Sequence, residues 1–294
     1  MAMINNIFVQ DPNRIIAYDG NDPVYLSSLL EDIFKLCRAL AEADQQRWIL
    51  VTHDTLNFLC AFYALLITGK DVLLPPNQQA GTIAEFVARP DAVIADSKCG
   101  LDLPYISIAG VRASCQVKPP AGFTGIATTK VSVELCTSGS TGEPQQIRKK
   151  VATLENEIKC LDALWGERVK DSVFASTVSH QHIYGLLFRV LWPLCAGYRF
   201  VARNIDYPEQ LESISCQYGA ITLVSSPAYL KRMLDVLDKQ RLAEHLKIIF
   251  SSGGPLDGLT AEAYLDSLGQ APVEVLGSTE TGGVAWRRQA HGND

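Results

Sequence analysis

The 294-residue sequence lacks the features that mark several large classes of protein. It has no basic excess, since 26 basic side chains stand against 32 acidic ones and the formal net charge is −6. A dedicated nucleic-acid binder normally carries a basic excess, so we expect no nucleic-acid partner. The two short basic clusters, residues 148–150 (RKK) and 287–288 (RR), are typical of solvated surface.

Long apolar runs and closely paired cysteines are also missing. No apolar run reaches the roughly 20 residues of a membrane-spanning helix, and the first residues show no signal-peptide pattern. The eight cysteines are scattered and form no C-x-x-C pair, which excludes a zinc ribbon and a thioredoxin motif. The 21 glycines and 14 prolines are at the ordinary globular level. These absences predict a cytoplasmic protein with reduced cysteines and no membrane span.

What the sequence does contain is an alternation of short apolar runs and helical periods. Strands are predicted at residues 48–52, 72–74, 92–95, 131–136, 171–176, 220–224, 246–250 and 273–276. Helices are predicted at residues 26–40, 55–67 and 183–196, along the stripe Ile158, Leu161 and Trp165 up to Gly166, from Pro208 to Gly219, and from an N-cap at Ser226 with Pro227 following. This alternation indicates an α/β fold with a mostly parallel sheet and helices on both faces.

We expect two α/β subdomains, residues 1–168 and 169–294, with residues 116–130 as a loop between blocks. Ligands of open α/β sheets bind at the carboxyl ends of strands, so the segments that follow strands are the candidate sites. Three of these segments are rich in glycine and hydroxyl side chains.

The first segment comprises Thr137, Ser138, Gly139, Ser140, Thr141 and Gly142. Glycines let successive backbone N–H groups turn inward as an anion nest, and the hydroxyls add donors, which suits a polyphosphate. A plain flexible turn is the alternative. Glu143 stands where a Walker A loop needs Lys, which disfavours a P-loop kinase, and G-x-G-x-x-G and G-x-S-x-G are absent.

The other two segments are residues 277–283 (GSTETGG) and 251–256 (SSGGPL). In the former, the Glu280 carboxylate between hydroxyls suits Mg²⁺, and in the latter small residues would let a flat ring lie on the backbone. Each segment also fits an ordinary turn. His180 and His182 form an H-x-H pair without a nearby carboxylate or cysteine, so a structural or substrate-facing role is favoured over metal binding.

Taken together and in this order, these segments and residues 179–185 (SHQHIYG) resemble the adenylate-forming (AMP-binding) superfamily. That superfamily contains acyl-CoA synthetases, peptide-synthetase adenylation domains and beetle luciferases. The resemblance implies two mostly parallel sheets in a layered αβαβα core. It covers essentially the whole chain, more loosely in residues 1–125.

The resemblance also implies roles for individual residues. Thr137, Ser138, Gly139, Ser140, Thr141 and Gly142 would hold the β- and γ-phosphates of ATP. The adenine would be lined by Gly253, Gly254, Pro255, Leu276, Gly277 and Ser278. The catalytic residues would be His182 beside the carboxylate, Thr279 on phosphate and Glu280 on Mg²⁺, with residues 225–227 in the pocket wall.

The implied activity is that of an AMP-forming acid–thiol ligase, which makes an acyl-adenylate and passes the acyl group to CoA or an acyl carrier protein. Leu186, Leu187 and Phe188 favour a hydrophobic or aromatic carboxylic acid. The alternative is a non-catalytic module that binds nucleotide or a partner.

The sequence departs from the family pattern in three ways. Gln145 stands where the family usually has Lys, and Lys149 or Lys150 would replace that charge only in part, because a point charge four residues away is no close substitute. Leu276 replaces an aromatic residue, so adenine stacking should be weaker. The chain has 14 residues after Glu280, and residues 287–294 show no packing pattern, so we expect only the N-terminal part of such a ligase, without its barrel subdomain and C-terminal domain.

Overall fold

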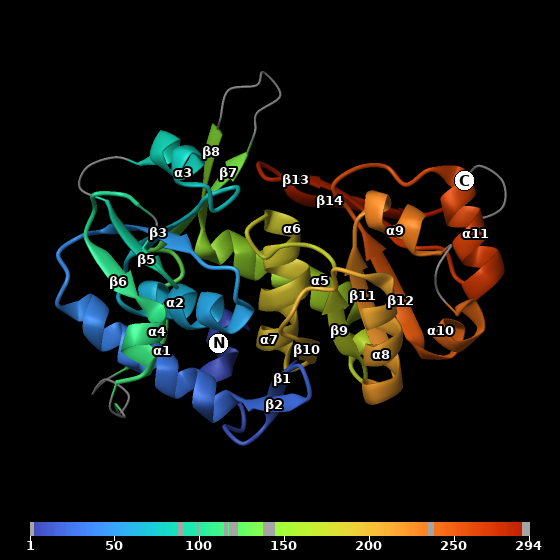
Figure 1. Ribbon diagram of the computed structural model, residues 1–294, viewed down its shortest axis with the longest axis horizontal. Coiled ribbons are helices and arrows are strands. Elements are labelled where there is room, and N and C mark those ends of the chain that lie inside the picture. Colours follow the sequence, from blue (N-terminus) through green and yellow to red (C-terminus); the bar gives the residue numbers. More distant parts are fainter. Residues whose placement is uncertain are drawn as a thin grey trace. The chain divides into compact units, whose positions relative to one another are not determined.

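The structure is a computed structural model that describes residues 3–87, 91–98, 100–114, 117, 123–137, 145–234 and 238–289. The chain divides into two compact units, each with its own sheet (Figure 1). Unit 1 contains Met1–Ile15 and Pro23–Asn156, and unit 2 contains Ile16–Asp22 and Glu157–Asp294. The division between residues 168 and 169 that we inferred from the sequence stays a prediction.

Unit 1 is built on a six-stranded sheet in the order β6-β5-β3-β4-β7-β8. All neighbours are parallel except β8, which runs antiparallel to β7. The strands are β3 (Arg47–Val51), β4 (Asp71–Leu74), β5 (Ala92–Ala95), β6 (Tyr105–Ser107), β7 (Ser132–Thr137) and β8 (Gln145–Lys150). The four apolar strands were predicted, whereas β8 carries a single apolar residue, Ile147, and therefore shows no alternation.

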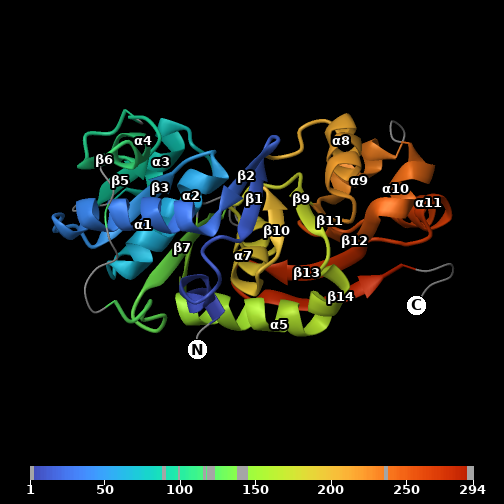
Figure 2. The same cartoon turned by 90° about the horizontal axis from the view of Figure 1, so that it is seen from below.

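Helices cover both faces of this sheet. They are η1 (Met3–Phe8), α1 (Leu26–Ala41), α2 (Thr55–Ile67), α3 (Ala80–Phe86) and α4 (Ile108–Arg112). The almost wholly apolar α2 packs on β3 and β4, and α1 packs along α2 (Figure 2). On the opposite face Ile83 and Phe86 of α3 join a buried cluster with Ile49, Leu73 and Val93.

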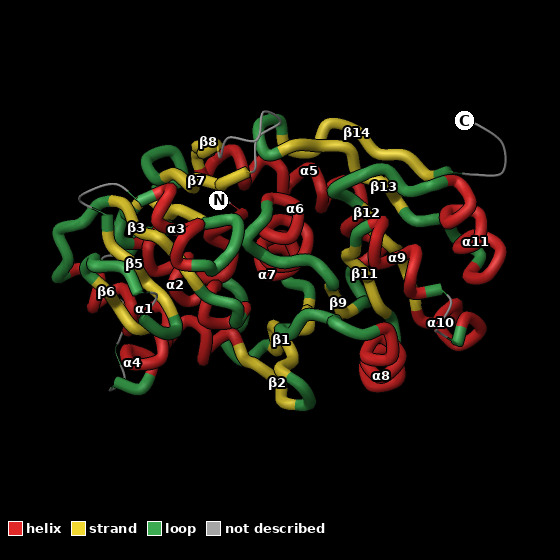
Figure 3. Tube along the Cα trace, turned by 45° about the horizontal axis from the view of Figure 1, so that its top comes forward, coloured by secondary structure: helices red, strands yellow, loops and turns green. Residues whose placement is uncertain are grey.

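Unit 2 contains all but the last strand of an eight-stranded sheet in the order β14-β13-β12-β11-β9-β10-β1-β2, and of β2 only Asp22 belongs to unit 2. The pairs from β1 through β13 are parallel, and β14 runs antiparallel to β13. Figure 3 draws the strands in yellow. The strands are β1 (Ile15–Asp19), β2 (Asp22–Tyr25), β9 (Val173–Ser176), β10 (Arg199–Val201), β11 (Ile221–Ser225), β12 (Leu246–Ser251), β13 (Val273–Ser278) and β14 (Gly282–Arg288). Two mostly parallel sheets therefore confirm the expected fold class.

Side chains alternate across the unit 2 sheet into two different cores. Val173, Leu223 and Ile249 face the helices α8 (Pro208–Tyr218), α9 (Pro227–Met233), α10 (Lys239–His245) and α11 (Gly258–Leu268). Phe174 and Phe250 instead contact aromatic rings of α5 (Val151–Val169), the π-helix η2 (Leu186–Leu191) and α7 (Trp192–Ala196). With the short α6 (Ile183–Gly185), the last two helices fill the predicted helical stretch 183–196.

One predicted helix end was wrong. Gly166 does not end α5, which continues to Val169. A glycine inside a helix costs only about 1 kcal/mol relative to alanine, and here the missing side chain makes room. A Cβ at Gly166 would lie 2.9 Å from both Tyr198 Oη and Asp162 Oδ1, which hydrogen-bond to each other. By contrast, Gly219 follows α8 as predicted, and Ser226 occupies the N-cap position of α9 without a side-chain cap bond.

The basic clusters are also less solvated than expected. Arg148 pairs with Asp71, Lys149 is buried, and Arg287 pairs with Glu274. Residues 287–294 showed no packing pattern in the sequence, but Arg287 and Arg288 are the last two residues of β14. Residues 290–294 lie outside the described part of the chain. Within the described ranges no helix has the length and apolarity needed to cross a bilayer.

The close approach at Gly185 can be tested directly. A Cβ there would lie 1.9 Å from the backbone oxygen of Ser179, so we expect Gly185→Ala to lower the free energy of unfolding by about 2 kcal/mol. At the helical control position Gly81 a Cβ meets nothing within 4 Å, and Gly81→Ala should add about 0.5–1 kcal/mol. Urea unfolding of both variants measures the difference, and an unchanged Gly185→Ala midpoint would contradict the contact.

Candidate functional site

The candidate site of unit 2 lies where the neighbouring strands β12 and β13 end. They pair in parallel through Phe250 with Val273 and Ser251 with Glu274. Their carboxyl ends therefore meet at one edge of the sheet, where the Ser252 hydroxyl donates to the Val275 carbonyl at 2.8 Å. Two cavities open at this edge, a larger one of about 610 Å³ and a smaller one of about 300 Å³.

The larger cavity is lined largely by backbone and small side chains. Its lining residues are Ser252, Gly253, Gly254, Pro255, Glu274, Val275, Leu276, Gly277, Ala285, Trp286 and Arg287. A Cβ at Gly253 or Gly254 would meet no atom within 4 Å, so both glycines leave open space above their backbone. Leu276 is 67% exposed and pairs across the strands with Ala285. This wall suits a flat ring lying on backbone and aliphatic carbon.

A carboxylate fixes one side of the larger cavity. Both Glu274 oxygens accept from Arg287, at 2.9 and 3.1 Å, and they also accept from the Gln289 amide and the Leu256 N–H. Burial pushes the pKa of Glu274 upward, but these donors outweigh it and hold the pKa below its usual value. Glu274 therefore ties β14 and the segment after β12 to β13. Neither Glu274 nor Arg287 was predicted, because each looks like an ordinary surface charge in the sequence.

The smaller cavity brings predicted residues from three segments together. His182, Gly253, Gly277, Ser278 and Thr279 all line it. The remaining lining residues come mainly from α5 and the helical stretch after His182, and they are Glu157, Leu161, Ile183, Tyr184, Leu187, Phe188, Ser252, Val275, Gly282 and Gly283. One wall is therefore apolar and aromatic, and the other carries hydroxyl and backbone groups.

The local backbone separates the roles of the two histidines. His180 is buried, whereas His182 is exposed at the N-cap position of α6 and lines the smaller cavity. Surrounding protein still displaces enough water to lower the pKa of His182, so its imidazole is neutral at pH 7. The described residues contain no group of three or more histidine, cysteine, aspartate or glutamate side chains arranged to hold a metal.

The turn from Ser278 to Gly283 is held tightly in place. Ser278 and Thr281 hydrogen-bond through their hydroxyls and backbone N–H groups. A Cβ at Gly277 would lie 2.3 Å from the Gly282 oxygen, and one at Gly282 would lie 2.4 Å from the Glu157 carboxylate. That carboxylate also accepts from the Gly283 N–H at 3.1 Å. Only glycine fits at these two positions, and the sequence did not predict the part played by Glu157.

Thr279 and Glu280 sit at the tip of this turn. Thr279 is half-buried in the cavity wall, and Glu280 is exposed. An exposed carboxylate beside hydroxyls fits Mg²⁺, which binds one or two protein carboxylates and takes its other ligands from phosphate and water.

The sequence of the chain matches one known protein family. The family described as AMP-binding enzyme matches residues 126–294, which is more than half of the chain. The chain belongs to the AMP-binding enzyme family.

Two curated relatives match parts of this AMP-binding chain. A 4-coumarate–CoA ligase from Cereibacter sphaeroides is 28% identical over 170 residues, covering 54% of this chain and 38% of the relative. Indigoidine synthase from Dickeya dadantii is 24% identical over 261 residues, covering 81% of this chain and 17% of the relative. ATP-bound MatB from Rhodopseudomonas palustris shares the fold, with a TM-score of 0.84, 19% identity and coverage of 98% and 61%. The chain thus spans less than two thirds of each of these proteins.

The predicted phosphate-binding segment of this AMP-binding chain belongs to unit 1. Thr137 ends β7 and pairs with Gln145, while Ser138, Gly139, Ser140, Thr141 and Gly142 lie outside the described residues. Lys149 and Lys150 pair with Val133 and Ser132, at the opposite end of the strands. At about 3.3 Å per residue they are about 13 Å or more from Gln145. This separation agrees with the expectation that neither lysine is a close substitute for a lysine at position 145.

The pocket wall at residues 225–227 stays a prediction, and the structure shows the surroundings of Ser225. Ser225 is buried, and its hydroxyl hydrogen-bonds to Thr177 at 2.9 Å. Its backbone lies beside the phenol of Tyr184, whose pKa is raised by burial well above the usual value. Tyr184 lines the smaller cavity, so the backbone of Ser225 contacts a residue of the cavity wall.

The lowered pKa of His182 gives a pH test. The unfolded chain takes up this proton near pH 6.5, and the folded chain does so only at lower pH. The stability contributed by neutral His182 is therefore complete above about pH 6.5 and is lost as pH falls through the folded pKa. NMR titration should give His182 a midpoint below 6.5, with its signal assigned by its absence from His182→Gln.

Unfolding measurements give an independent check on the same group. Below about pH 6.5 the stability of the wild type should fall more steeply than that of His182→Gln. His53→Gln, which alters an exposed histidine of unit 1, should keep the steep wild-type dependence. A His182 midpoint at or above 6.5 would contradict the desolvation.

Proposed function

We propose that this chain is the nucleotide- and acid-binding part of an AMP-forming acid–thiol ligase. Such a ligase joins a carboxylic acid to ATP, releases pyrophosphate, and passes the acyl group to CoA or to the phosphopantetheine thiol of an acyl carrier protein. The observation that carries the proposal is the smaller cavity, where His182 and the turn with Thr279 line one space. The ATP-bound state of MatB and the name of the 4-coumarate–CoA ligase support it. Because ATP and CoA are cytoplasmic metabolites, we place the reaction in the cytoplasm.

In this proposal the larger cavity receives the adenine of ATP or AMP. Gly253, Gly254 and Pro255 form one side of the base site, and Leu276, Gly277 and Ser278 form the other. The side chain of Leu276 gives aliphatic contact where an aromatic ring would stack, which makes stacking on that side weaker. Thr137 and residues 138–142 bind the β- and γ-phosphates through backbone N–H groups and hydroxyls.

The reaction brings two anions together, a carboxylate and a triphosphate. Neutral His182 borders the carboxylate without adding charge, and Thr279 donates to phosphate as negative charge develops. Mg²⁺ held by Glu280 would neutralise charge on the phosphate oxygens. The aromatic wall of the smaller cavity excludes water from the reacting carboxylate and orients it toward phosphorus.

The acid that fits this cavity is apolar or aromatic. Leu161, Leu187 and Phe188 present carbon to a space of about 300 Å³, and Tyr184 stacks at a tilt on Phe188 with ring centroids 4.8 Å apart. Burial of the acid's chain or ring against these groups would supply most of its binding energy.

A second candidate function is a nucleotide-binding module without turnover. Two observations favour it. Gln145, the first residue of β8, stands where the family usually has lysine, and Lys149 and Lys150 lie at the other end of the same strand. The two functions differ in whether carboxylic acid drives chemistry on ATP.

Exchange of labelled pyrophosphate into ATP separates them. We expect slow exchange that depends on added acid, because the chain spans less than two thirds of its relatives' length. Aromatic and medium-length aliphatic acids should exceed short polar ones, because the apolar wall must be filled. Binding of ATP with no exchange for any acid of such a panel, by this chain and by a version extended to the length of its relatives, would reject the ligase and favour the binding module.

The base site has its own test. Gly254→Leu places a side chain in the larger cavity without meeting protein atoms at Cβ, so we expect folding to be kept and the affinities for ATP and AMP to fall about tenfold or more. Gly81→Leu, at an exposed helical position with equal room, is the matched control and should bind as wild type. Calorimetric titration measures both, and undiminished binding by Gly254→Leu would place the nucleoside elsewhere.

A further inference from the structure

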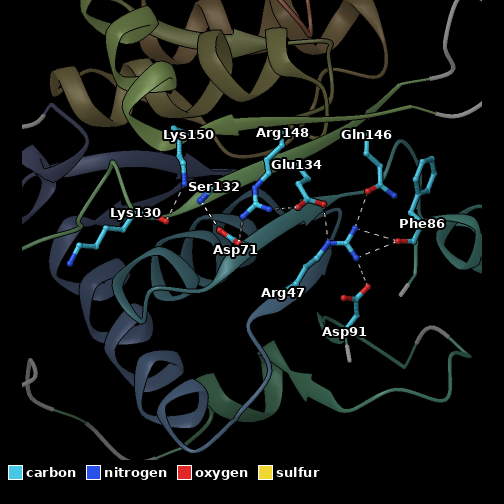
Figure 4. Close-up of polar contacts among 10 residues, drawn as sticks. All are labelled: Arg47, Asp71, Phe86, Asp91, Lys130, Ser132, Glu134, Gln146, Arg148 and Lys150. Atoms are coloured by element: carbon cyan, nitrogen blue, oxygen red, sulfur yellow. Dashed lines mark hydrogen bonds and ion pairs between the residues drawn. The ribbon is translucent and has the colours of Figure 1, made fainter. Parts of the chain in front are cut away.

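Unit 1 contains a charged network that none of the roles above uses (Figure 4). We call Arg47, Asp71, Asp91, Glu134 and Arg148 the charged network. Its members come from β3, β4, β7 and β8 and from the residue before β5. Asp91 is 3% exposed and the Glu134 side chain 9%, so carboxylates have been taken out of water at a cost that only close partners offset.

Glu134 is the centre of the charged network. One of its oxygens accepts from Arg47 Nε at 2.9 Å, and the other lies 3.8 Å from Arg148 Nη1. Arg47 also donates to Asp91, to the Phe86 carbonyl and to the Gln146 amide oxygen. Figure 4 shows the two guanidinium groups on either side of Glu134. The same carboxylate therefore links an inner strand to the edge strand.

Asp71 makes a second link between inner and edge strands. Its oxygens accept from Arg148 at 2.5 Å and from the Ser132 N–H at 2.8 Å. Asp71 begins β4, Ser132 begins β7 and Arg148 lies on β8. Three consecutive strands of the sheet are thus tied together through one side chain.

The edge strand β8 pairs with β7 through its backbone, buries Lys149, and places little apolar surface in the core. Gln145, Gln146, Arg148 and Lys150 are exposed, and Ile147 is only half-buried. The charged network lies on the same face of the sheet as the buried apolar residues Ile49, Leu73 and Cys136, because its members on these strands precede them by two residues. Charge pairing, rather than apolar burial, therefore positions β8 on this face.

The position of β8 matters because of what it carries. Glu134 of β7 pairs directly with Arg148 of β8. Thr137 follows Glu134 by three residues and Gln145 precedes Arg148 by three, and these two residues also pair and flank residues 138–144. We propose that the charged network is the positioning set for the phosphate-binding segment, acting through Glu134 and Arg148 on the strands at its two ends. This inference rests on the proposed function.

Unit 2 repeats the device. There too the last parallel strand, β13, pairs with an antiparallel edge strand, β14, and Glu274 lies directly across from Arg287. The segment between those strands carries Thr279 and Glu280. A cross-strand glutamate–arginine pair thus stands behind each of the two segments assigned to the phosphates.

The test compares three variants of the whole chain. Arg148→Met removes the charge of a side chain that is 56% exposed, so it leaves no buried void. Arg148→Lys keeps the charge and loses the planar fork. Arg203→Met is the matched control, because Arg203 is exposed and pairs with Asp19 at 2.6 Å in unit 2.

Two measurements are made on each variant, the affinities for ATP and for AMP and the hydrogen exchange of β8 amides. We expect Arg148→Met to weaken ATP about tenfold and AMP less than about twofold, because only ATP carries β- and γ-phosphates, and to speed β8 exchange. Arg148→Lys should fall between, and Arg203→Met should match wild type. Equal weakening of both nucleotides, as a general structural defect would cause, overturns the inference, as does unchanged ATP binding or unchanged exchange.

Failure of the proposed function shows itself differently. A wild-type chain that binds no ATP overturns the proposed function and this inference together. A wild-type chain that binds ATP, with variants that lose ATP and AMP equally, overturns the inference alone.

Discussion

The parallel pairing of β12 with β13 is the constraint on which the candidate site depends. It puts Ser252–Pro255 beside Val275–Ser278, and both cavities draw their shared lining residues Ser252, Gly253, Val275 and Gly277 from these two segments. Residues more than 20 positions apart in sequence meet there because parallel strands end at the same edge. Two hydrogen bonds keep the segments together past the last paired residues. The Ser252 hydroxyl donates to the Val275 carbonyl, and the Leu256 N–H donates to the Glu274 carboxylate.

Small residues set how closely these segments approach. Gly277 lies against the Gly282 backbone, and Gly282 lies against the Glu157 carboxylate, so the turn that carries Thr279 and Glu280 is seated on α5. Gly253 and Gly254 serve the opposite purpose, since the space beyond their backbone is empty. Glycine thus allows protein to touch protein on one side of the site, and it leaves room for a ligand on the other.

Charge organises the edges of both sheets. Each unit pairs the last parallel strand of its sheet with one antiparallel edge strand, and each anchors that edge strand with a glutamate opposite an arginine. Buried carboxylates are costly unless they gain close partners. Glu274 accepts several hydrogen bonds, and Glu134 accepts one from Arg47 and forms an ion pair with Arg148. The physical consequence is a directional hold on a strand that hydrophobic burial alone would leave loosely specified.

The sequence by itself determined the fold class, eight of the strands, the helix α2 with its exact limits and the family to which the chain belongs, whereas the short apolar strands β1 and β10 were missed. Those features are written in local patterns, namely apolar runs, glycine-rich segments after strands and end signals such as Gly219. Only the tertiary structure decided the roles of Glu157, Glu274 and Glu134, and the fates of Gly166, Arg148 and Arg287. The meaning of a charge or a glycine depends on which distant atoms stand within a few ångströms, and spacing along the chain does not encode those contacts.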